Sequence, residues 1–478
     1  MARNILLILF SLMFLFTEGI WGGEITPPGP MAEGERVGPI QIELPYPGKK
    51  AKTGLSGPRK SKKKNVVAFD LDAPPKTRIE LTPELSFGVR IGLEYQLEKN
   101  FNMETRVRDD LYIKTPELSF AFLYTPTEKF YTFLNVDFSR SIVNDERMRT
   151  EKKRKKKDET DLDLKQVFFS YTIMDGLNLK VGRQRIKDKR EWVYDEKLDA
   201  IRLTYEFSKF KFDFSASEKK DKDLYDNHGS DERFNNFVLY GRYAPNKDTE
   251  IAAYGFVRDG RSKKRKENPI FYGLQVNGEL IDDLDYWLNF AHVRGRSGTD
   301  KLRGFGFDSG FTYEFDDVPL KPSIVLGYAF GSGDDNTSDN RDRSFRQTGL
   351  QDNNAKLNGV SKIKYYGEMF DPELSNLIIA TGGIGIRPMR KTSIELIYHY
   401  YRQHKRSDEI FDAEIDEDPD GLNKILGQEI DLVAAYKYKN KKINIKTSMV
   451  LGYFMPGQAF SREADNSLFA EFKIQFDF

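Results

Sequence analysis

The sequence contains no cysteine, and this absence excludes several classes of functional site. None of the 478 residues is Cys, so a disulfide framework, a zinc–thiolate site and a cysteine nucleophile are ruled out. Histidine is scarce as well, with four residues in the chain. The closest pair in sequence, His399 and His404, has an odd spacing, which places two side chains on opposite faces of a strand. We therefore expect no metal site built on histidine.

The sequence also lacks net charge and long hydrophobic runs. Its 75 Lys and Arg against 74 Asp and Glu leave a charge of +1, which gives no indication of a nucleic-acid partner. A mean hydropathy of −0.61 excludes an ordinary helical membrane protein. The one long apolar run, Ile5 to Phe16, follows Arg3, is too short to span a bilayer and leads to Gly19 and Gly22. That form predicts a secretory signal peptide over residues 1–22, with a buried N-terminal helix as the alternative.

Aromatic residues, in contrast, are abundant. The 36 Phe and 24 Tyr would supply the aromatic girdles that flank the lipid-facing band of a membrane barrel. An exported, polar, aromatic-rich chain indicates the outer membrane of a double-membraned bacterium, with a soluble periplasmic β protein as the alternative. Residues 23–77 are rich in Pro, Gly and Lys and show no periodicity, so we predict a disordered extension there.

Beyond Glu84 the apolar and polar residues alternate, which predicts strands with two chemically different faces. In the last segment Leu468 and Phe476 share one parity, and Lys473 has the other. In a soluble sheet the apolar face would cover a core, whereas in an outer-membrane barrel it faces lipid and the polar face lines a lumen. The chain stops on Phe478, and an alternating strand that ends on an aromatic residue resembles the signal that outer-membrane assembly machinery recognises.

The number and spacing of these segments favour a barrel. The segments are 85–95, 111–124, 130–140, 162–173, 177–186, 198–207, 210–217, 234–243, 250–257, 270–276, 284–294, 302–315, 322–331, 377–386, 393–402, 429–438, 443–454 and 467–478. Short connections such as 208–209 alternate with long charged ones such as 141–160 and 332–375. A sandwich or propeller has no reason to separate long from short connections in this way. We predict an all-β fold, an 18-stranded antiparallel transmembrane outer-membrane β-barrel over residues 78–478.

Seven segments, in order along the chain, resemble the alginate-export outer-membrane porin family. They are GRQRIKDKREWVYDEKLDAIRL (182–203), GYAFGSGDD (327–335), FRQTGLQDN (345–353), YYGEMFDPELSNL (365–377), IYHYYR (397–402), GQEIDL (427–432) and YFMPGQAF (453–460). The resemblance implies a barrel that exports an anionic exopolysaccharide, alginate or a related polyuronate, past arginines at a constriction. It also implies a monomer that receives the polymer from a periplasmic scaffold of a secretion complex, surrounded by outer-membrane lipid and lipopolysaccharide.

Two departures from the family pattern lie near the penultimate strand. Well-known members carry two arginines where this chain has Ser448 and Val450, with Lys446 nearby on the luminal parity. They also carry a long periplasmic loop before that strand, where this chain has residues 439–441.

The residues that would guide an acidic polymer are cations on the luminal parity. Arg offers a permanently charged bidentate fork for a carboxylate, and a narrow pore focuses its field. Such binding must stay weak and repeated, so interspersed acids such as Glu206 and Asp199 would moderate it. The candidate pore-lining cations are Arg90, Arg202, Arg242, Lys446 and Arg346, the last carried by the segment 332–375, which we expect to fold into the pore. Each arginine could instead form a structural ion pair.

Arg183 and Arg185 share the parity of Leu179 and Val181, which would aim them at lipid. At the bilayer midplane this would cost about 2–4 kcal/mol for each residue. We therefore expect both arginines to act at the extracellular rim of the pore, or to be turned inward by a bulge near Gly182.

Two other functions stay open as alternatives, and no cofactor is expected. One is a general or solute-specific porin for small anionic solutes. The other is an enzyme at the outer rim built on His399, Glu395 and Tyr401, although nothing there positions a nucleophile, so we predict that the protein is not an enzyme. Acidic extracellular stretches such as Asp412 to Asp420 could bind Ca²⁺ weakly, but they lack the twelve-residue calcium-loop pattern.

Overall fold

The computed structural model describes residues 77–103, 110–145, 158–219, 234–260, 267–336, 338–415, 417–440 and 443–478. The predicted signal peptide (1–22), and the predicted extension (23–77) except for its last residue, therefore lie outside the described residues. Within the described ranges the regular structure consists of strands, and no helix there is long and apolar enough to cross a membrane.

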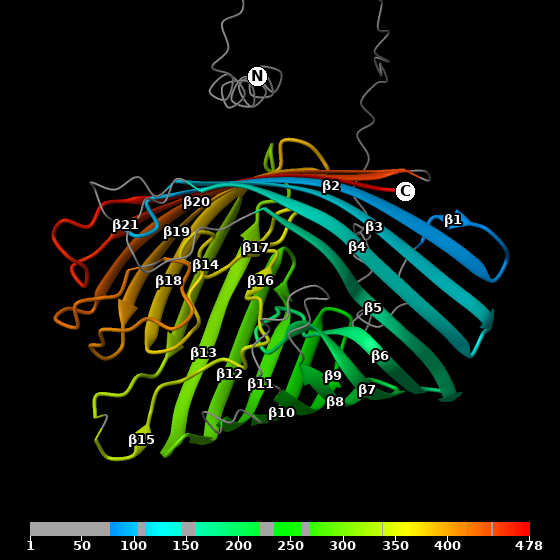
Figure 1. Cartoon of the computed structure of the whole chain (residues 1–478), viewed down its shortest axis with the longest axis horizontal. Coiled ribbons are helices and arrows are strands. Elements are labelled where there is room, and N and C mark those ends of the chain that lie inside the picture. Colours follow the sequence, from blue (N-terminus) through cyan, green and yellow to red (C-terminus); the bar gives the residue numbers. More distant parts are fainter. Residues whose placement is uncertain are drawn as a thin grey trace, which may run out of the picture. The chain divides into compact units, whose positions relative to one another are not determined.

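Eighteen long strands form one closed antiparallel barrel, as the sequence predicted (Figure 1). They are β2 (Leu85–Lys99), β3 (Leu111–Thr127), β4 (Phe130–Asp145), β5 (Glu159–Met174), β6 (Leu177–Lys187), β7 (Asp195–Phe207), β8 (Phe210–Lys219), β9 (Phe234–Tyr243), β10 (Thr249–Gly260), β11 (Glu267–Ile281), β12 (Leu284–Ser297), β13 (Asp300–Glu314), β14 (Ser323–Gly331), β18 (Leu377–Ile386), β19 (Thr392–Gln403), β20 (Ile425–Lys439), β21 (Asn444–Pro456) and β22 (Ser467–Asp477). Each strand pairs with its neighbour in the chain, and β2 pairs with β22 to close the ring. Closure leaves no free sheet edge, which lipid would not tolerate.

Four short strands complete the structure. β1 (Ile79–Glu80) pairs with β2, and β15 (Arg341–Asp342) runs parallel to the start of β13. β16 (Asn354–Ala355) and β17 (Ile363–Lys364) pair with each other. All but β1 belong to the connection between β14 and β18.

The long connections lie at one end of the barrel and the short turns at the other, as predicted, with one exception. β12 and β13 are joined by Gly298 and Thr299 alone, at the end where the other connections are long. Because bacterial barrels place their short turns in the periplasm, the end that carries the long connections is the extracellular one.

The two faces of each strand differ as the alternation predicted. On β7 the side chain of Ile201 is 56% exposed, whereas that of its neighbour Arg202 is 4% exposed. Outward-facing rings gather near the periplasmic turns, where Phe207 stacks on Phe210 with ring centroids 5.5 Å apart and Phe210 stacks on Tyr243 at 4.8 Å. An exposed apolar band with an aromatic edge is the surface that a bilayer covers.

The core lies inside the barrel, because the connection between β14 and β18 folds into the lumen (Figure 1). We call residues 332–376 the inward loop. Its Phe370 is fully buried and stacks on Phe454 of β21 at 5.1 Å and against Tyr401 of β19 at 4.6 Å. These contacts agree with the expectation that the segment 332–375 enters the pore.

Candidate transport pathway

The inward loop is held between opposite walls of the barrel. On one side it meets residues 188–194, the connection between β6 and β7, where the indole N–H of Trp192 donates to the Tyr366 hydroxyl at 2.8 Å. The side-chain amide of Gln347 donates to the Trp192 carbonyl at 3.0 Å. On the other side the Tyr401 hydroxyl donates to the Tyr366 carbonyl at 2.8 Å. The sequence indicated that 187–197 is an extracellular loop, but its Trp192 and Val193 turn inward and are buried.

Three luminal carboxylates anchor the inward loop through its main chain. Glu429 of β20 accepts the backbone N–H groups of Met369 at 2.7 Å and Phe370 at 3.1 Å. Asp431 accepts the N–H of Glu368 at 3.3 Å, and Glu395 of β19 accepts that of Gly359 at 3.0 Å. A buried N–H group that loses its acceptor is costly, so these carboxyl groups fix the path of the loop.

A glycine permits the close approach at this anchor. Gly367 has a φ of +115°, and a Cβ there would collide with the Tyr401 hydroxyl and with the Glu429 carboxylate. Another residue would therefore be strained and would push the loop away from β20.

A cation between two rings joins the inward loop to the barrel wall. The guanidinium of Arg190 lies 4.1 Å from the Trp287 ring centre and 4.4 Å from that of Tyr365, and its Nη2 lies 3.6 Å from Asp308 Oδ2. Cation–π contacts contribute about 2 kcal/mol or more when desolvated. Arg190 therefore helps to hold the loop in the lumen.

Buried cations gather on the luminal face of β7, β8 and β9, towards the periplasmic turns. We call Arg202, Lys211 and Arg242 the inner cation cluster; none exceeds 4% exposure. Asp213 is shared by two of them, because Arg202 Nε donates to Asp213 Oδ1 at 2.7 Å and Arg242 Nη2 lies 3.6 Å from Oδ2. Neither Nη atom of Arg242 has a hydrogen-bond acceptor within the described ranges.

A second group of cations lies where the inward loop meets β20 and β21. We call Lys356, Lys362, Lys437 and Lys446 the loop-tip lysines. Lys437 and Lys446 are register partners on adjacent strands, and Lys437 Nζ donates to the Val360 carbonyl of the loop. Burial, and then the nearby charges of Arg387 and Lys362, lower the pKa of Lys356. Carboxylates would relieve this mutual repulsion.

The remaining luminal candidates are paired with acids. Arg90 Nε donates to Asp477 Oδ1 at 2.7 Å where β2 meets β22, and Lys446 Nζ lies 3.3 Å from the other oxygen of that carboxylate. Arg346 lies on the inward loop and pairs with Asp342 at 2.9 Å. Glu206 Oε2 lies 4.0 Å from Lys211 Nζ, so this acid is placed where it can moderate the inner cation cluster.

Three candidate pore residues have the outward parity, which the alternation had indicated for Arg183 and Arg185 but not for Asp199. Arg183 is the register partner of Asp199. This pair lies on the same face as the lipid-facing register pair Val181 and Ile201, two residues further along each strand towards the extracellular end. The pairing of β6 shows no register shift at Gly182, so the alternative of an inward-turning bulge is not observed. Asp199 has odd parity on a strand whose even positions face the lumen, so the expectation that it moderates the lumen was a parity error. Neither Arg183 nor Asp199 lines the pathway.

Arg185 also has the outward parity and lies at the extracellular rim. It forms an ion pair with Asp195, and its Nη2 lies 3.8 Å from Glu191 Oε1. Burial is the largest cause that raises the pKa of Glu191, to about 7. This position agrees with the rim alternative that the alternation offered.

One cluster of carboxylates in the described part of the chain is accompanied by cations. Glu191, Asp195 and Asp352 bring one oxygen each within 4.8 Å of one another, but Lys362 contacts Glu191 and Lys364 Nζ lies 2.9 Å from Asp352. The stretch Asp412 to Asp420, for which weak Ca²⁺ binding was considered, does not belong to that group.

His399, Glu395 and Tyr401, the residues considered as a possible enzyme site, are buried inside the barrel. His399 is fully buried, with Nδ1 2.9 Å from the Thr381 hydroxyl and Nε2 3.4 Å from Asp431. Glu395 and Tyr401 are engaged by the inward loop as described above.

Sequence reasoning missed several of these cations for different reasons. Lys211 stands between Phe210 and Phe212, so strict alternation would have placed it in the lumen. Lys437 could have been found in the same way. Arg190 and the lysines of the inward loop could not have been found by alternation. They lie in connections without periodicity, and their neighbours come from distant strands.

Comparisons with known proteins agree with this architecture. The sequence model of the family described as "Alginate export" matches residues 83–471. The alginate production protein AlgE of Pseudomonas aeruginosa is 24% identical over 366 residues, which cover 64% of this chain and 71% of that protein. AlgE of Pseudomonas syringae pv. tomato is 22% identical over 363 residues, 62% of this chain and 71% of that one.

Solved structures of the same fold include Pseudomonas aeruginosa OccK5 (OpdH), with a TM-score of 0.53 and 9% identity over 84% of this chain and 99% of that one. OccK7 (OpdD) of the same organism has a TM-score of 0.52 and 12% identity, and the match covers 83% of this chain and 98% of that one. At such identities the likeness concerns the fold alone. The match of the family model over most of the barrel goes further, and it shows that this chain belongs to the alginate export family.

Proposed function

We propose that the protein is an outer-membrane channel that exports an anionic polysaccharide, alginate or a related polyuronate, and that it is not an enzyme. The observation that carries the proposal is the combination of family membership with two groups of cations in the lumen, the inner cation cluster and the loop-tip lysines. Arg202 and Arg242 both contact Asp213, and burial together with the charges of Arg387 and Lys362 lowers the pKa of Lys356.

In this pathway the polymer meets two sets of cations on different parts of the barrel wall, both close to the periplasmic turns, since Arg242 precedes the turn at 244–248 and Lys437 precedes the turn at 440–443. A uronate carries one carboxylate per sugar, so each residue of the chain can exchange one cation for the next as it advances. The inner cation cluster would receive carboxylates near the periplasmic turns, and the loop-tip lysines would receive them beside the inward loop. Each contact must stay weak for the polymer to leave. Because the inward loop packs against both walls, we infer that it moves or loosens during export.

The experiment is ion selectivity and block in planar bilayers. Reversal potentials of the purified protein in a KCl gradient should show anion selectivity, and polymannuronate or polyguluronate should block the current while a neutral glucan should not. Arg242→Gln and Arg202→Gln should each reduce the anion preference severalfold, because a focused cation field sets it. Arg296→Gln, the same change on an exposed residue of β12, is the matched control.

The result that would overturn the proposal is cation selectivity, or a current that no acidic polymer reduces. Block by a monomeric uronate but not by the polymer would favour the alternative of a porin for small anionic solutes.

A further inference from the structure

The luminal face of β3 to β5 carries apolar side chains near the periplasmic turns, where the lumen of a barrel is ordinarily polar. Phe133 and Phe168 are register partners, and their ring centroids lie 5.7 Å apart. Leu123 of β3 is the next register partner of Phe133. The ring of Tyr131 lies 6.1 Å from that of Phe168 in an edge-to-face arrangement. We call these four residues the apolar shelf.

The apolar shelf faces the lumen and not lipid. On β5 the chain neighbours Val167 and Phe169 are 39% and 40% exposed on the outer face, whereas Phe168 between them is 4% exposed. On β4, Phe130 stacks on Phe169 at 6.2 Å, so Tyr131, the next residue, projects inward. Tyr131 is partly exposed, and it is therefore the ring of the shelf that a solute in the lumen can reach.

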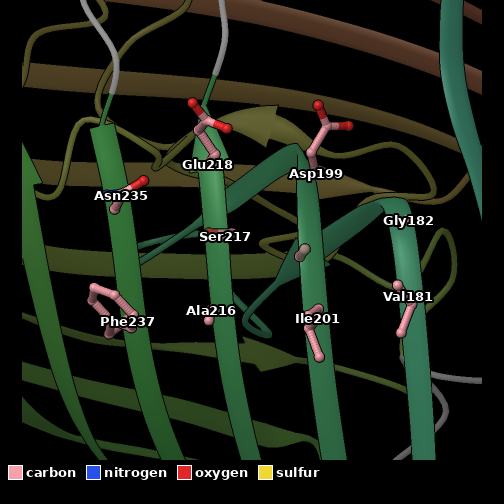
Figure 2. A pocket seen from close by; sticks show the side chains of 10 residues that line it. Val181, Gly182, Asp199, Ile201, Ala216, Ser217, Glu218, Asn235 and Phe237 are labelled. Atoms are coloured by element: carbon pink, nitrogen blue, oxygen red, sulfur yellow. The ribbon is translucent and has the colours of Figure 1, made fainter.

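Two cations of the lumen stand beside the shelf. The successive register partners on β4, β5, β6 and β7 are Tyr131, Ser170, Lys180 and Arg202. Val181 and Ile201, which alternate with the two cations, lie side by side at a hollow of the outer face (Figure 2). Lys180 and Arg202 therefore project from the inner face. Lys180 Nζ lies 5.0 Å from the ring centre of Phe168, so the shelf and the cation are in contact.

A glycine lets the shelf lie against the strand that carries Lys180. Gly182 is the register partner of Phe168 and has a φ of +121°. A Cβ there would collide with the backbone of Val167 and Phe168. Another residue at this position would be strained and would push Phe168 away from Lys180.

We propose that the apolar shelf and Lys180 form a subsite for single uronate rings of the exported polymer, an inference that rests on the export function above. A pyranose ring presents C–H groups on one face, and such a face packs on the negative face of an aromatic ring. The sugar would lie on Tyr131, and its carboxylate would pair with the ammonium of Lys180. Two strand spacings, about 10 Å, separate these residues, so both contacts fall within a short stretch of polymer.

Such a subsite gives the pathway a selectivity that its cations alone do not supply. A field of buried arginines attracts any polyanion. An aromatic surface beside a cation distinguishes a chain of acidic sugars from another chain of the same charge, because only the sugar gains the ring contact.

The test compares how long two polyanions with equal numbers of carboxylates block the purified protein in planar bilayers. Polymannuronate has pyranose rings, and poly-L-glutamate has none. We expect each block by polymannuronate to last about five times longer, and Tyr131→Ala to abolish this difference without changing block by poly-L-glutamate. Tyr131→Phe should keep the difference. Tyr171→Ala, which removes the same side chain from the outer face of β5, should keep it as well.

Equal block times in the unmodified protein, or a difference that Tyr131→Ala leaves intact, would overturn the subsite while the export function stands. An equal loss of block by both polymers in Tyr131→Ala would also overturn it, because Tyr131 would then only shape the wall. Block by neither polymer in the unmodified protein would refute export of a polyuronate, and the subsite with it. Heat-modifiable migration on gels verifies that each variant is folded.

Discussion

Glu429 illustrates how a single luminal residue can hold the inward loop in the lumen. Each oxygen of its carboxyl group accepts one main-chain N–H of the inward loop, from Met369 and Phe370. Tyr401, whose hydroxyl donates to the Tyr366 carbonyl, lies 2.8 Å from the same group. Glu429 lies in GQEIDL, one of the segments on which the family resemblance rests. Both oxygens are needed as acceptors, and the amide of a glutamine offers only one.

Glu429→Gln is therefore expected to loosen the inward loop. The amide has one acceptor oxygen and turns its own N–H₂ towards a donor, at a cost of about 1–3 kcal/mol. That corresponds to roughly a tenfold rise in the undocked population, so the mean single-channel conductance should increase. Glu128→Gln, the same change on an exposed residue of the turn between β3 and β4, provides the control. Unchanged conductance in Glu429→Gln would contradict the anchoring role.

At the scale of elements, strands and connections differ in how far the sequence determines them. Alternation predicted all eighteen barrel strands, because a side-chain period of two is imposed by the contrast between lipid and lumen. Pro116 lies inside β3 opposite Leu93, so the proline that weakened the prediction is accommodated. The path of the inward loop within the lumen was not predictable, because contacts between residues distant in sequence determine it.

The inward loop contains an acid whose titration should regulate its docking. Burial raises the pKa of Glu373 to about 7, and its carboxylate accepts the N–H of Gln347. Because the pKa is raised in the docked state, the contribution to docking is fully present below the ordinary pKa of about 4.5 and is lost as the pH rises through about 7. We expect conductance to increase between about pH 4.5 and pH 7. Glu373→Gln should flatten this dependence, and an unchanged pH profile in that variant would refute the assignment.

At the scale of the whole molecule, the barrel and its contents are separable structures. Closure depends on strand pairing, including the pairing of β14 with β18 on either side of the inward loop. The site could be predicted only in part. The luminal parity of Arg90, Arg202 and Arg242 followed from the sequence, but the packing that buries the latter two did not, because the covering groups come from connections.

Replacing residues 345–374 by a short Gly–Ser linker should therefore leave a folded barrel. Loss of the packed interior should raise conductance severalfold and weaken block by polyuronates, since Lys356 and Lys362 are removed with it while Lys437 and Lys446 remain on the wall. Heat-modifiable migration and bilayer recordings together measure both results. A variant that fails to form the barrel would show that the interior contents are required for closure.

Glu395 of β19 and Glu429 and Asp431 of β20 accept hydrogen bonds from the main chain of the inward loop. A main-chain N–H group is present whatever side chain the residue carries. Natural substitution can therefore replace Lys356 and Lys362 while these hydrogen bonds remain. The same barrel wall can thus hold inward loops of different sequence. Exchanging residues 355–363 between relatives that handle different acidic polymers should transfer cargo preference without redesign of the wall.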